Sequence, residues 1–284
     1  METASGGTGV SGAVVIGTFD GVHVGHRHVL DAALATGLPV TALTFHPHPR
    51  TVVHGNLVES ISTLERRREL LLAAGTVEVR VIAFDLDTAA QAPEAFAAEH
   101  LAGADVVVAG EDFRFGHRRA GDLALLERLG HAVVAVPLLH GVSSSEIRRL
   151  VHEGDLAGAA CLLGRPFELD GVVVPGDQRG GTLGYPTANL AVEPGLLVPR
   201  YGIYAGAARG HRAAVSIGTN PHYGGQERRI EPYLLDFEGD LYGQRLVLEL
   251  WERLRDEQSF ASEAELVAQI ARDVERTRAV ERPG

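Results

Sequence analysis

The 284-residue sequence contains no lysine, and all 26 of its basic residues are arginines. Many ATP-binding proteins hold the β- and γ-phosphates with the lysine of a P-loop, Gly-x-x-x-x-Gly-Lys. This chain cannot form such a loop. Any phosphate must therefore be held by arginine, histidine, hydroxyl groups, backbone N–H groups or a metal ion.

Cysteine and long apolar runs are also scarce. The one cysteine, Cys161, cannot form an internal disulfide, which fits a reducing compartment. No stretch approaches 18 uninterrupted apolar residues, and the first residues lack the basic and apolar segments of a signal peptide. We therefore expect a cytoplasmic protein that makes no contact with a membrane.

The formal charge of −11 disfavours a nucleic-acid partner, which would require a basic face. Apolar residues at 45% and charged residues at 22% are ordinary for a globular protein with a packed core. We expect small-molecule substrates, no nucleic acid, and a monomer or weak homo-oligomer.

The first half of the chain alternates strand-like and helix-like segments. This rhythm predicts a doubly wound parallel sheet covered on both faces, with ligands bound beyond the carboxyl ends of the strands. The predicted strands are residues 13–17, 40–45, 77–84, 105–109 and 132–136. The predicted helices are residues 25–34, 64–74, 93–101 and 123–129, and residues after 45 are expected to form an irregular loop.

After about residue 160 glycine and proline become frequent, and short β-rich runs follow one another. They predict a small antiparallel β-barrel, with a closing helix over residues 262–277 that Ser262 and Glu265 cap. The barrel runs are residues 168–174, 203–209, 213–217, 231–236 and 246–251. The expected fold is thus an α/β domain over residues 1–158 followed by a β domain over 159–284, with the boundary inside a helical stretch at 150–163.

Residues 17–26 read Gly-Thr-Phe-Asp-Gly-Val-His-Val-Gly-His, directly after the first predicted strand. The glycines let backbone approach a ligand, and the helix that follows offers unpaired N–H groups to phosphate. His23 and His26 can then stabilise the charge on an attacked phosphate and its pyrophosphate leaving group. Two alternatives stay open: the histidines only cap or pack at a turn, or neighbouring histidines bind zinc with them.

Residues 176–189 form a glycine-rich segment without lysine that ends in Pro-Thr-Ala-Asn. Backbone N–H groups at glycines such as Gly176 and Gly184 can cradle phosphates. Thr187 and Asn189 are two residues apart, so on a strand their oxygens share a face and suit Mg²⁺. A glycine-rich hairpin with an Asx turn fits the same residues.

These motifs resemble those of bacterial bifunctional riboflavin kinase/FAD synthetases. In the first half the resemblance includes residues 17–26, 44–49 (Thr-Phe-His-Pro-His-Pro), 110–116 (Gly-Glu-Asp-Phe-Arg-Phe-Gly) and 142–148 (Val-Ser-Ser-Ser-Glu-Ile-Arg). In the second half it includes Pro-Thr-Ala-Asn, residues 217–221, 231–237 and 240–243. The matching blocks keep the family order over about residues 13–277.

The resemblance implies that the second domain phosphorylates riboflavin to FMN and the first adenylylates FMN to FAD, each with ATP and Mg²⁺. It implies Glu231, His23 and His26 as catalytic residues, and Thr187 and Asn189 as magnesium ligands. The nucleotide- and flavin-binding residues that it implies are Gly17, Phe19, Asp20, Gly21, Pro47, Asp112, Phe113, Ser144, Ser145, Arg148, Gly176, Gly184, Pro186, Thr187, Asn189 and Arg255.

These roles agree with the chemistry of the two steps. The riboflavin 5′-hydroxyl is a poor nucleophile, and the Glu231 carboxylate can accept its proton, although a strand glutamate is ordinarily a solvated surface residue. Arg148 lies one helical turn beyond Ser144 and Ser145, so its guanidinium can join their hydroxyls around a phosphate. Residues 143–145 also suit a helix N-cap.

The chain departs from the family pattern near the expected kinase site, at residues 222–223 and 232–233. Pro232 also lacks an N–H group, which predicts an edge strand or a bulge beside Glu231. One alternative is therefore the same architecture with only the FMN adenylyltransferase step active. Another is a nucleotidyltransferase acting on a phosphoalcohol or pantetheine phosphate, and a third is a non-catalytic flavin-binding protein.

Overall fold

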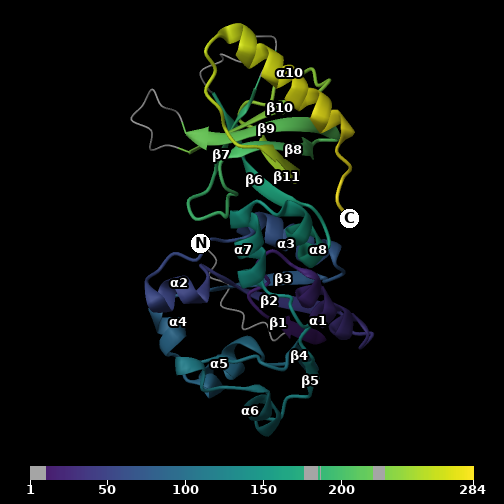
Figure 1. Ribbon diagram of the computed structural model, residues 1–284. Coiled ribbons are helices and arrows are strands. Elements are labelled where there is room, and N and C mark those ends of the chain that lie inside the picture. The colour runs from purple at the N-terminus through teal and green to yellow at the C-terminus, as the bar shows by residue number, and fades with distance from the viewer. Residues whose placement is uncertain (1–10, 176–184, 186, 220–227) are drawn as a thin grey trace, which may run out of the picture. The chain divides into compact units, whose positions relative to one another are not determined.

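The computed structural model describes residues 11–175, 185, 187–219 and 228–284. The chain divides into two compact units (Figure 1). Unit 1 comprises Met1–Ser60 and Leu64–Val142, and unit 2 comprises Ile61–Thr63 and Ser143–Gly284. The boundary expected at residue 158 falls within helix α8 (Leu156–Leu163) of unit 2.

Unit 1 is built on a five-stranded parallel sheet with the order β3-β2-β1-β4-β5. Its strands are β1 (Ala13–Ile16), β2 (Val40–His46), β3 (Glu78–Ala83), β4 (Val106–Gly110) and β5 (Val133–Val136). All five strand predictions are confirmed, with ends that shift by at most one residue. The order changes direction between β1 and β4, which is where parallel sheets bind ligands.

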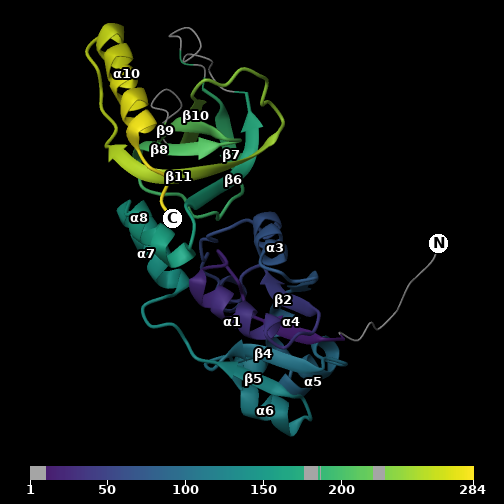
Figure 2. The same cartoon turned by 90° about the vertical axis from the view of Figure 1, so that its right-hand side faces the viewer.

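Helices cover both faces of this sheet, as predicted. They are α1 (Val24–Leu34), α3 (Leu64–Ala73), α5 (Pro93–His100) and α6 (Leu123–Arg128). Val15 of β1 packs in one core with Leu30 of α1, and Ile16 packs in another with Phe96 of α5. Because neighbouring strand residues point to opposite faces, one buried strand supplies both cores. Figure 2 shows the backbone of this sheet and its helices from a second side.

Two short helices of unit 1 were not predicted: α2 (Pro49–His54), where a loop was expected, and α4 (Leu86–Ala90). Proline suits the first turn of a helix, and His48 Nδ1 accepts the Arg50 N–H (3.1 Å). Asp85 Oδ1 accepts the Thr88 N–H (2.8 Å) at the start of α4. These helices are too short to show a periodic apolar pattern, and local caps define them.

Unit 2 contains a six-stranded antiparallel sheet with the order β10-β9-β8-β11-β6-β7. The strands are β6 (Phe167–Val174), β7 (Asn189–Val192), β8 (Gly202–Ala208), β9 (His211–Thr219), β10 (Arg228–Leu234) and β11 (Arg245–Arg255). The Ala188 N–H donates to the Pro232 carbonyl (3.0 Å), so the two ends of the sheet meet. The predicted barrel is confirmed and is nearly closed; β7 was not among the predicted strands.

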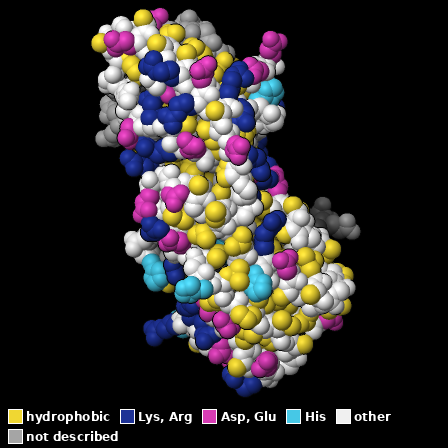
Figure 3. All heavy atoms as spheres, turned by 45° about the vertical axis from the view of Figure 1, so that its right-hand side comes forward, with side chains coloured by type: hydrophobic (Ala, Val, Ile, Leu, Met, Phe, Trp, Pro, Cys, Tyr) yellow, Lys and Arg dark blue, Asp and Glu magenta, His cyan; other side chains and the backbone are white. Residues whose placement is uncertain are grey.

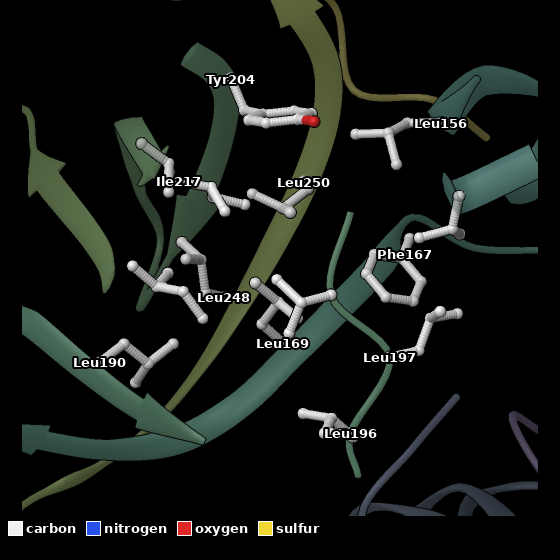
Figure 4. Packing of buried hydrophobic residues seen from close by; sticks show 14 of the residues in the cluster. Leu156, Phe167, Leu169, Leu190, Leu196, Leu197, Tyr204, Ile217, Leu248 and Leu250 are labelled. Atoms are coloured by element: carbon white, nitrogen blue, oxygen red, sulfur yellow. The ribbon is translucent and has the colours of Figure 1, made fainter. Parts of the chain in front are cut away.

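The barrel encloses one apolar core (Figure 4). Leu169, Leu248 and Leu250 come from its central strands and are fully buried. Full burial of one leucine side chain contributes about 1.5–3 kcal/mol, so this core carries much of the stability of unit 2. Ile61 belongs to the same core, which explains why residues 61–63 belong to unit 2 although they lie between two segments of unit 1.

Helices α7 (Ser144–Glu153) and α8 replace the single helical stretch expected at 150–163. Gly154 separates them at a φ of 82°, a left-handed conformation that favours glycine. Ser143 caps α7 by accepting the Glu146 N–H (3.1 Å), which confirms the N-cap prediction for this segment.

Arginines fasten the closing helix α10 (Glu263–Ala279) to the barrel. The predicted cap is confirmed, since Ser262 Oγ accepts the Glu265 N–H (3.2 Å). The fastening contacts are Arg255 with Asp273 (2.7 Å), Arg276 with the Leu254 carbonyl (2.9 Å), Arg212 with the Thr277 carbonyl (2.9 Å), Arg278 with Asp236 (2.6 Å) and Arg282 with Glu249 (2.7 Å). Arg255, Arg278 and Arg282 each bind their carboxylate through two nitrogens, a contact that a guanidinium forms and an ammonium group does not.

Every dark blue side chain in Figure 3 is an arginine, because the sequence lacks lysine. On this face they lie among acidic side chains and form no continuous basic surface. The arginines of this chain thus serve, in part, to pair with aspartate and glutamate side chains of the same chain.

Candidate functional site

The turn that follows β1 has an unusual backbone. Phe19, Gly21 and Val22 adopt positive φ angles of 48°, 78° and 41°. A β-branched residue such as Val22 rarely adopts this conformation, which costs energy and persists only where the surroundings impose it. The Val22 N–H donates to the Phe19 carbonyl (3.0 Å) and closes the turn.

His23 and His26 lie together at the start of α1. His23 is the N-cap, and its Nδ1 accepts the His26 N–H (3.3 Å). The two imidazole rings stack with centroids 3.6 Å apart, and the His26 ring meets the Phe19 ring edge-on at 5.3 Å. His23 therefore does cap the helix, and the cap brings both imidazoles to the same helix N-terminus.

The environment of His26 disfavours its protonated form. Burial holds the pKa of His26 well below its ordinary value, and the nearby His23 and Arg67 lower that pKa further. Its Nδ1 atom is buried and has no hydrogen-bond partner among the described residues. A neutral imidazole keeps one donor and one acceptor nitrogen, and a bound phosphate would favour the charged form again.

The other predicted residues of unit 1 lie at the same edge of the sheet. Val15 of β1 pairs with Val108 of β4. The same register, continued by two residues, places Gly17 opposite Gly110. Asp112 and Phe113 come shortly after Gly110 in the chain. Pro47 follows β2 through a cis peptide bond. Because the strands are parallel, the turn at 17–22, Pro47, Asp112 and Phe113 all lie beyond their carboxyl ends.

Asp20 lies under the turn rather than at its surface, since its side chain is completely buried. Its Oδ1 is 3.6 Å from Nη2 of Arg67 on α3, which is 3% exposed. Sequence reasoning missed Arg67 because three consecutive arginines resemble a solvated helix face. Its spacing from Leu64 and Leu71, three and four residues away, would have placed it on the buried face.

Ser144, Ser145 and Arg148 lie in the first turns of α7. This helix belongs to unit 2, whereas the histidines belong to unit 1. Their joint contact with one nucleotide remains a prediction.

Glu231 lies on the outer face of β10. Ile230, Pro232 and Leu234 are buried, so Glu231 and Tyr233 alternate with them and point outward. The Glu231 side chain is 33% exposed, with Oε1 3.8 Å from Nη1 of Arg229. The sheet order places β10 at an end, which confirms the edge-strand prediction for Pro232.

Two contacts bring the Pro-Thr-Ala-Asn segment to this strand. The Ala188 N–H bonds to the Pro232 carbonyl, and the Tyr185 and Tyr233 rings meet edge-on at 5.4 Å. Thr187 and Asn189 flank Ala188, so they share the outer face with Glu231. Asn189 begins β7, whereas Thr187 precedes that strand.

Some of the predicted residues lie outside the described part of the chain: Gly176, Gly184, Pro186 and the departure at 222–223. Arg255 lies at the end of β11, where its guanidinium holds Asp273 of α10 through three hydrogen bonds of 2.7–3.1 Å. Its placement accounts for attachment of the helix; a role in ligand binding stays a prediction.

Comparison with known proteins shows the family to which this chain belongs. Residues 163–281 match the riboflavin kinase family, and residues 9–147 match the FAD synthetase family. The bifunctional riboflavin kinase/FMN adenylyltransferase of Listeria monocytogenes is 34% identical over 293 residues, covering 96% of this chain and 93% of that protein. The chain belongs to the bifunctional riboflavin kinase/FMN adenylyltransferase family.

Further relatives agree with this family. The Escherichia coli K12 protein of the same name is 34% identical over 281 residues, covering 92% of this chain and 90% of its own length. A Streptococcus pneumoniae crystal structure described as a macrolide-efflux protein superimposes with a TM-score of 0.86, at 32% identity and 96% coverage of both chains. That description differs from both family matches, and the similarity extends over both units. No helix in the described part of this chain is long and apolar enough to cross a membrane.

Proposed function

We propose that this chain catalyses both steps from riboflavin to FAD. Unit 2 transfers the γ-phosphoryl group of ATP to the riboflavin 5′-hydroxyl, and unit 1 transfers the adenylyl group of a second ATP to FMN. The observation that carries this proposal is that each unit matches its own enzyme family and holds its own set of reactive groups. The alternative with adenylylation alone is not favoured, because the kinase family match over residues 163–281 includes all the strands of unit 2 and its closing helix.

In unit 1 an FMN phosphate oxygen attacks the α-phosphorus of ATP, and pyrophosphate leaves. The N–H groups at the start of α1 and the imidazoles of His23 and His26 are suited to stabilise the charge on these phosphates. Pro47, Asp112 and Phe113 line the same strand edge and are proposed to contact the flavin.

Ser144, Ser145 and Arg148 are proposed to complete the phosphate contacts of unit 1. The resemblance supports this role, since residues 142–148 match the family segment that contacts the phosphates of ATP.

In unit 2 the Glu231 carboxylate is proposed to accept the proton of the 5′-hydroxyl as the phosphoryl group transfers. The outward direction of Glu231 and its position beside Thr187 and Asn189 support this role. The hydroxyl of Thr187 and the amide oxygen of Asn189 are hard ligands that fit Mg²⁺, which when bound neutralises charge on the transferring phosphates.

The proposed substrates are small molecules: riboflavin, FMN and ATP, the last as its magnesium complex. A cytoplasmic location and a monomeric or weakly associating chain belong to the same proposal. Light scattering of the purified protein over a tenfold concentration range measures the association state, and a stable large oligomer would contradict that part.

A time course tests the proposal. Purified protein is incubated with riboflavin, ATP and MgCl₂, and riboflavin, FMN and FAD are separated by chromatography. We expect FMN first and FAD later, with pyrophosphate formed in proportion to FAD. If riboflavin persists while added FMN becomes FAD, the kinase part of the proposal fails. If FMN accumulates and never becomes FAD, the adenylylation part fails.

A further inference from the structure

The buried pair of Asp20 and Arg67 lies directly under the turn that carries the two histidines. The Asp20 side chain is fully buried and that of Arg67 is 3% exposed. A charge removed from water in this way needs a partner, and each of these groups supplies one for the other (3.6 Å). Neither side chain is exposed enough to serve as a ligand-binding surface.

Arg67 also connects the turn to the end of strand β2. Its Nη1 donates to the Phe45 carbonyl (3.0 Å) and to Thr44 Oγ1 (3.3 Å). The Thr44 hydroxyl in turn donates to the Thr18 carbonyl (2.8 Å). One guanidinium on α3 thus fixes the turn after β1 against the neighbouring strand.

The turn requires such an anchor because its backbone is strained. Phe19 and Val22 hold positive φ angles on either side of Asp20, and the next residue is the N-cap His23. Because His23 orients His26 through a hydrogen bond and ring stacking, a shift of the turn would move both imidazoles.

We propose that Arg67 is a positioning residue for adenylyl transfer: through Asp20 and Thr44 it fixes the turn that places His23 and His26 at the phosphates of ATP. This inference rests on the proposed function of unit 1. Arg67 touches neither substrate, and its effect passes through the turn. The positive charge of Arg67 is also one cause, after burial and His23, of the lowered pKa of His26.

The test compares R67M with R68M, a control that makes the same change at the exposed neighbour on α3. We expect R67M to lower kcat for FMN adenylylation by about 10²-fold, as small displacements of reacting groups do, with a smaller change in KM. R68M should match the wild type. R67K should be intermediate, since an ammonium group keeps the charge but lacks the planar fork of donors.

Two readouts separate positioning from a general loss of structure. Riboflavin phosphorylation in the same samples reports on unit 2 and should be unchanged in all three variants. The pKa of the His26 imidazole, measured by NMR titration, should rise in R67M because a neighbouring cation is removed, and should not change in R68M. Wild-type kcat in R67M, or an unaltered His26 pKa, would overturn the inference.

If R67M fails to fold, the double variant D20N/R67M replaces it, since it leaves no unpaired buried charge. A folded D20N/R67M protein should still adenylylate FMN slowly, and wild-type kcat in this variant would also overturn the inference. Wild-type protein that makes no FAD from FMN would instead overturn the proposed function of unit 1, whereas the NMR titration would still measure the coupling of Arg67 to His26.

Discussion

The two units present their reactive groups in different ways, although both are proposed to hold ATP without a lysine. Unit 1 uses a strained turn and a helix N-terminus, with an ion pair buried beneath them. Unit 2 uses ordinary strand alternation, which turns Glu231 outward while Ile230 and Leu234 face the core. The site of unit 1 therefore depends on buried packing below it, and that of unit 2 depends on strand register.

This difference predicts how each unit responds to substitution. A change beneath the turn of unit 1 should alter catalysis without touching substrate, as proposed for Arg67. A substitution on the outer face of β10 should remove the chemical function of the replaced side chain and leave the positions of its neighbours unchanged. Substitutions beneath the turn of unit 1 should leave riboflavin phosphorylation intact, and substitutions on the outer face of β10 should leave FMN adenylylation intact.

The largest effect is expected for E231Q. Loss of the proposed general base should lower kcat for riboflavin phosphorylation by about 10²–10⁴-fold, and FMN adenylylation should stay at the wild-type rate. The assay is chromatography with riboflavin or FMN as the starting substrate. E238Q, at an exposed glutamate beyond the same strand, is the control. An E231Q enzyme with normal phosphorylation would remove Glu231 from the mechanism.

H26A should have the next largest effect, and that effect should be on FMN adenylylation. Removal of one group that stabilises the developing charge should lower kcat for FMN adenylylation by about 10²–10³-fold, while riboflavin phosphorylation continues. H28A changes an exposed histidine on the same helix and should behave as the wild type. Equal rates in H26A and H28A would contradict the role given to His26.

D273N should weaken unit 2 rather than either reaction. Asp273 is 3% exposed and holds Arg255, so loss of its charge leaves that guanidinium without its carboxylate. We expect the free energy of unfolding of unit 2 to fall by about 3 kcal/mol. The measurement is unfolding of the protein in urea, followed by the fluorescence of Trp251. E275Q, at an exposed position of α10, should change it little. Similar urea midpoints for the two variants would show that the ion pair does not fasten the helix.

The lowered pKa of His26 predicts a smaller effect, on the pH dependence of stability. The unfolded chain binds a proton at His26 near pH 6.5, whereas the folded chain binds it only at lower pH. The stability of unit 1 should therefore decrease as pH falls below about 6.5, down to the folded pKa. H26Q should lose less stability than the wild type between pH 7.5 and 5.5 in urea denaturation. An equal loss would show that His26 does not make this contribution.

The sequence predicted the elements that show a clear apolar pattern or a recognisable cap. The strands β1, β2 and β4 of unit 1 are largely apolar and buried, and the closing helix carries its own cap at Ser262. The short helix α2 and the four-residue strand β7 were missed because local caps and pairing with β6 define them. The turn at residues 17–22 was predicted as a motif, but its positive φ angles depend on contacts that no local pattern shows.

Long-range polar contacts could not be predicted. The Thr63 hydroxyl donates to Asp170, which lies 107 residues further along the chain and also accepts two hydrogen bonds from Arg245 (2.8 Å each). Arg67 meets Thr44 and Asp20 only once α3 packs on the sheet. The spacing of Arg67 from Leu64 and Leu71 indicates a buried position, but its partners Asp20 and Thr44 become visible only in the folded structure.

The central claim, that two separate sites act in sequence, is tested most directly by mixing E231Q with H26A in the presence of riboflavin, ATP and MgCl₂. Alone, E231Q should leave riboflavin unchanged, and H26A should stop at FMN. The mixture should form FAD, because FMN released by H26A is a substrate for E231Q. If each variant keeps its remaining activity and the mixture still forms no FAD, the two sites do not act as separate catalysts and the account is contradicted.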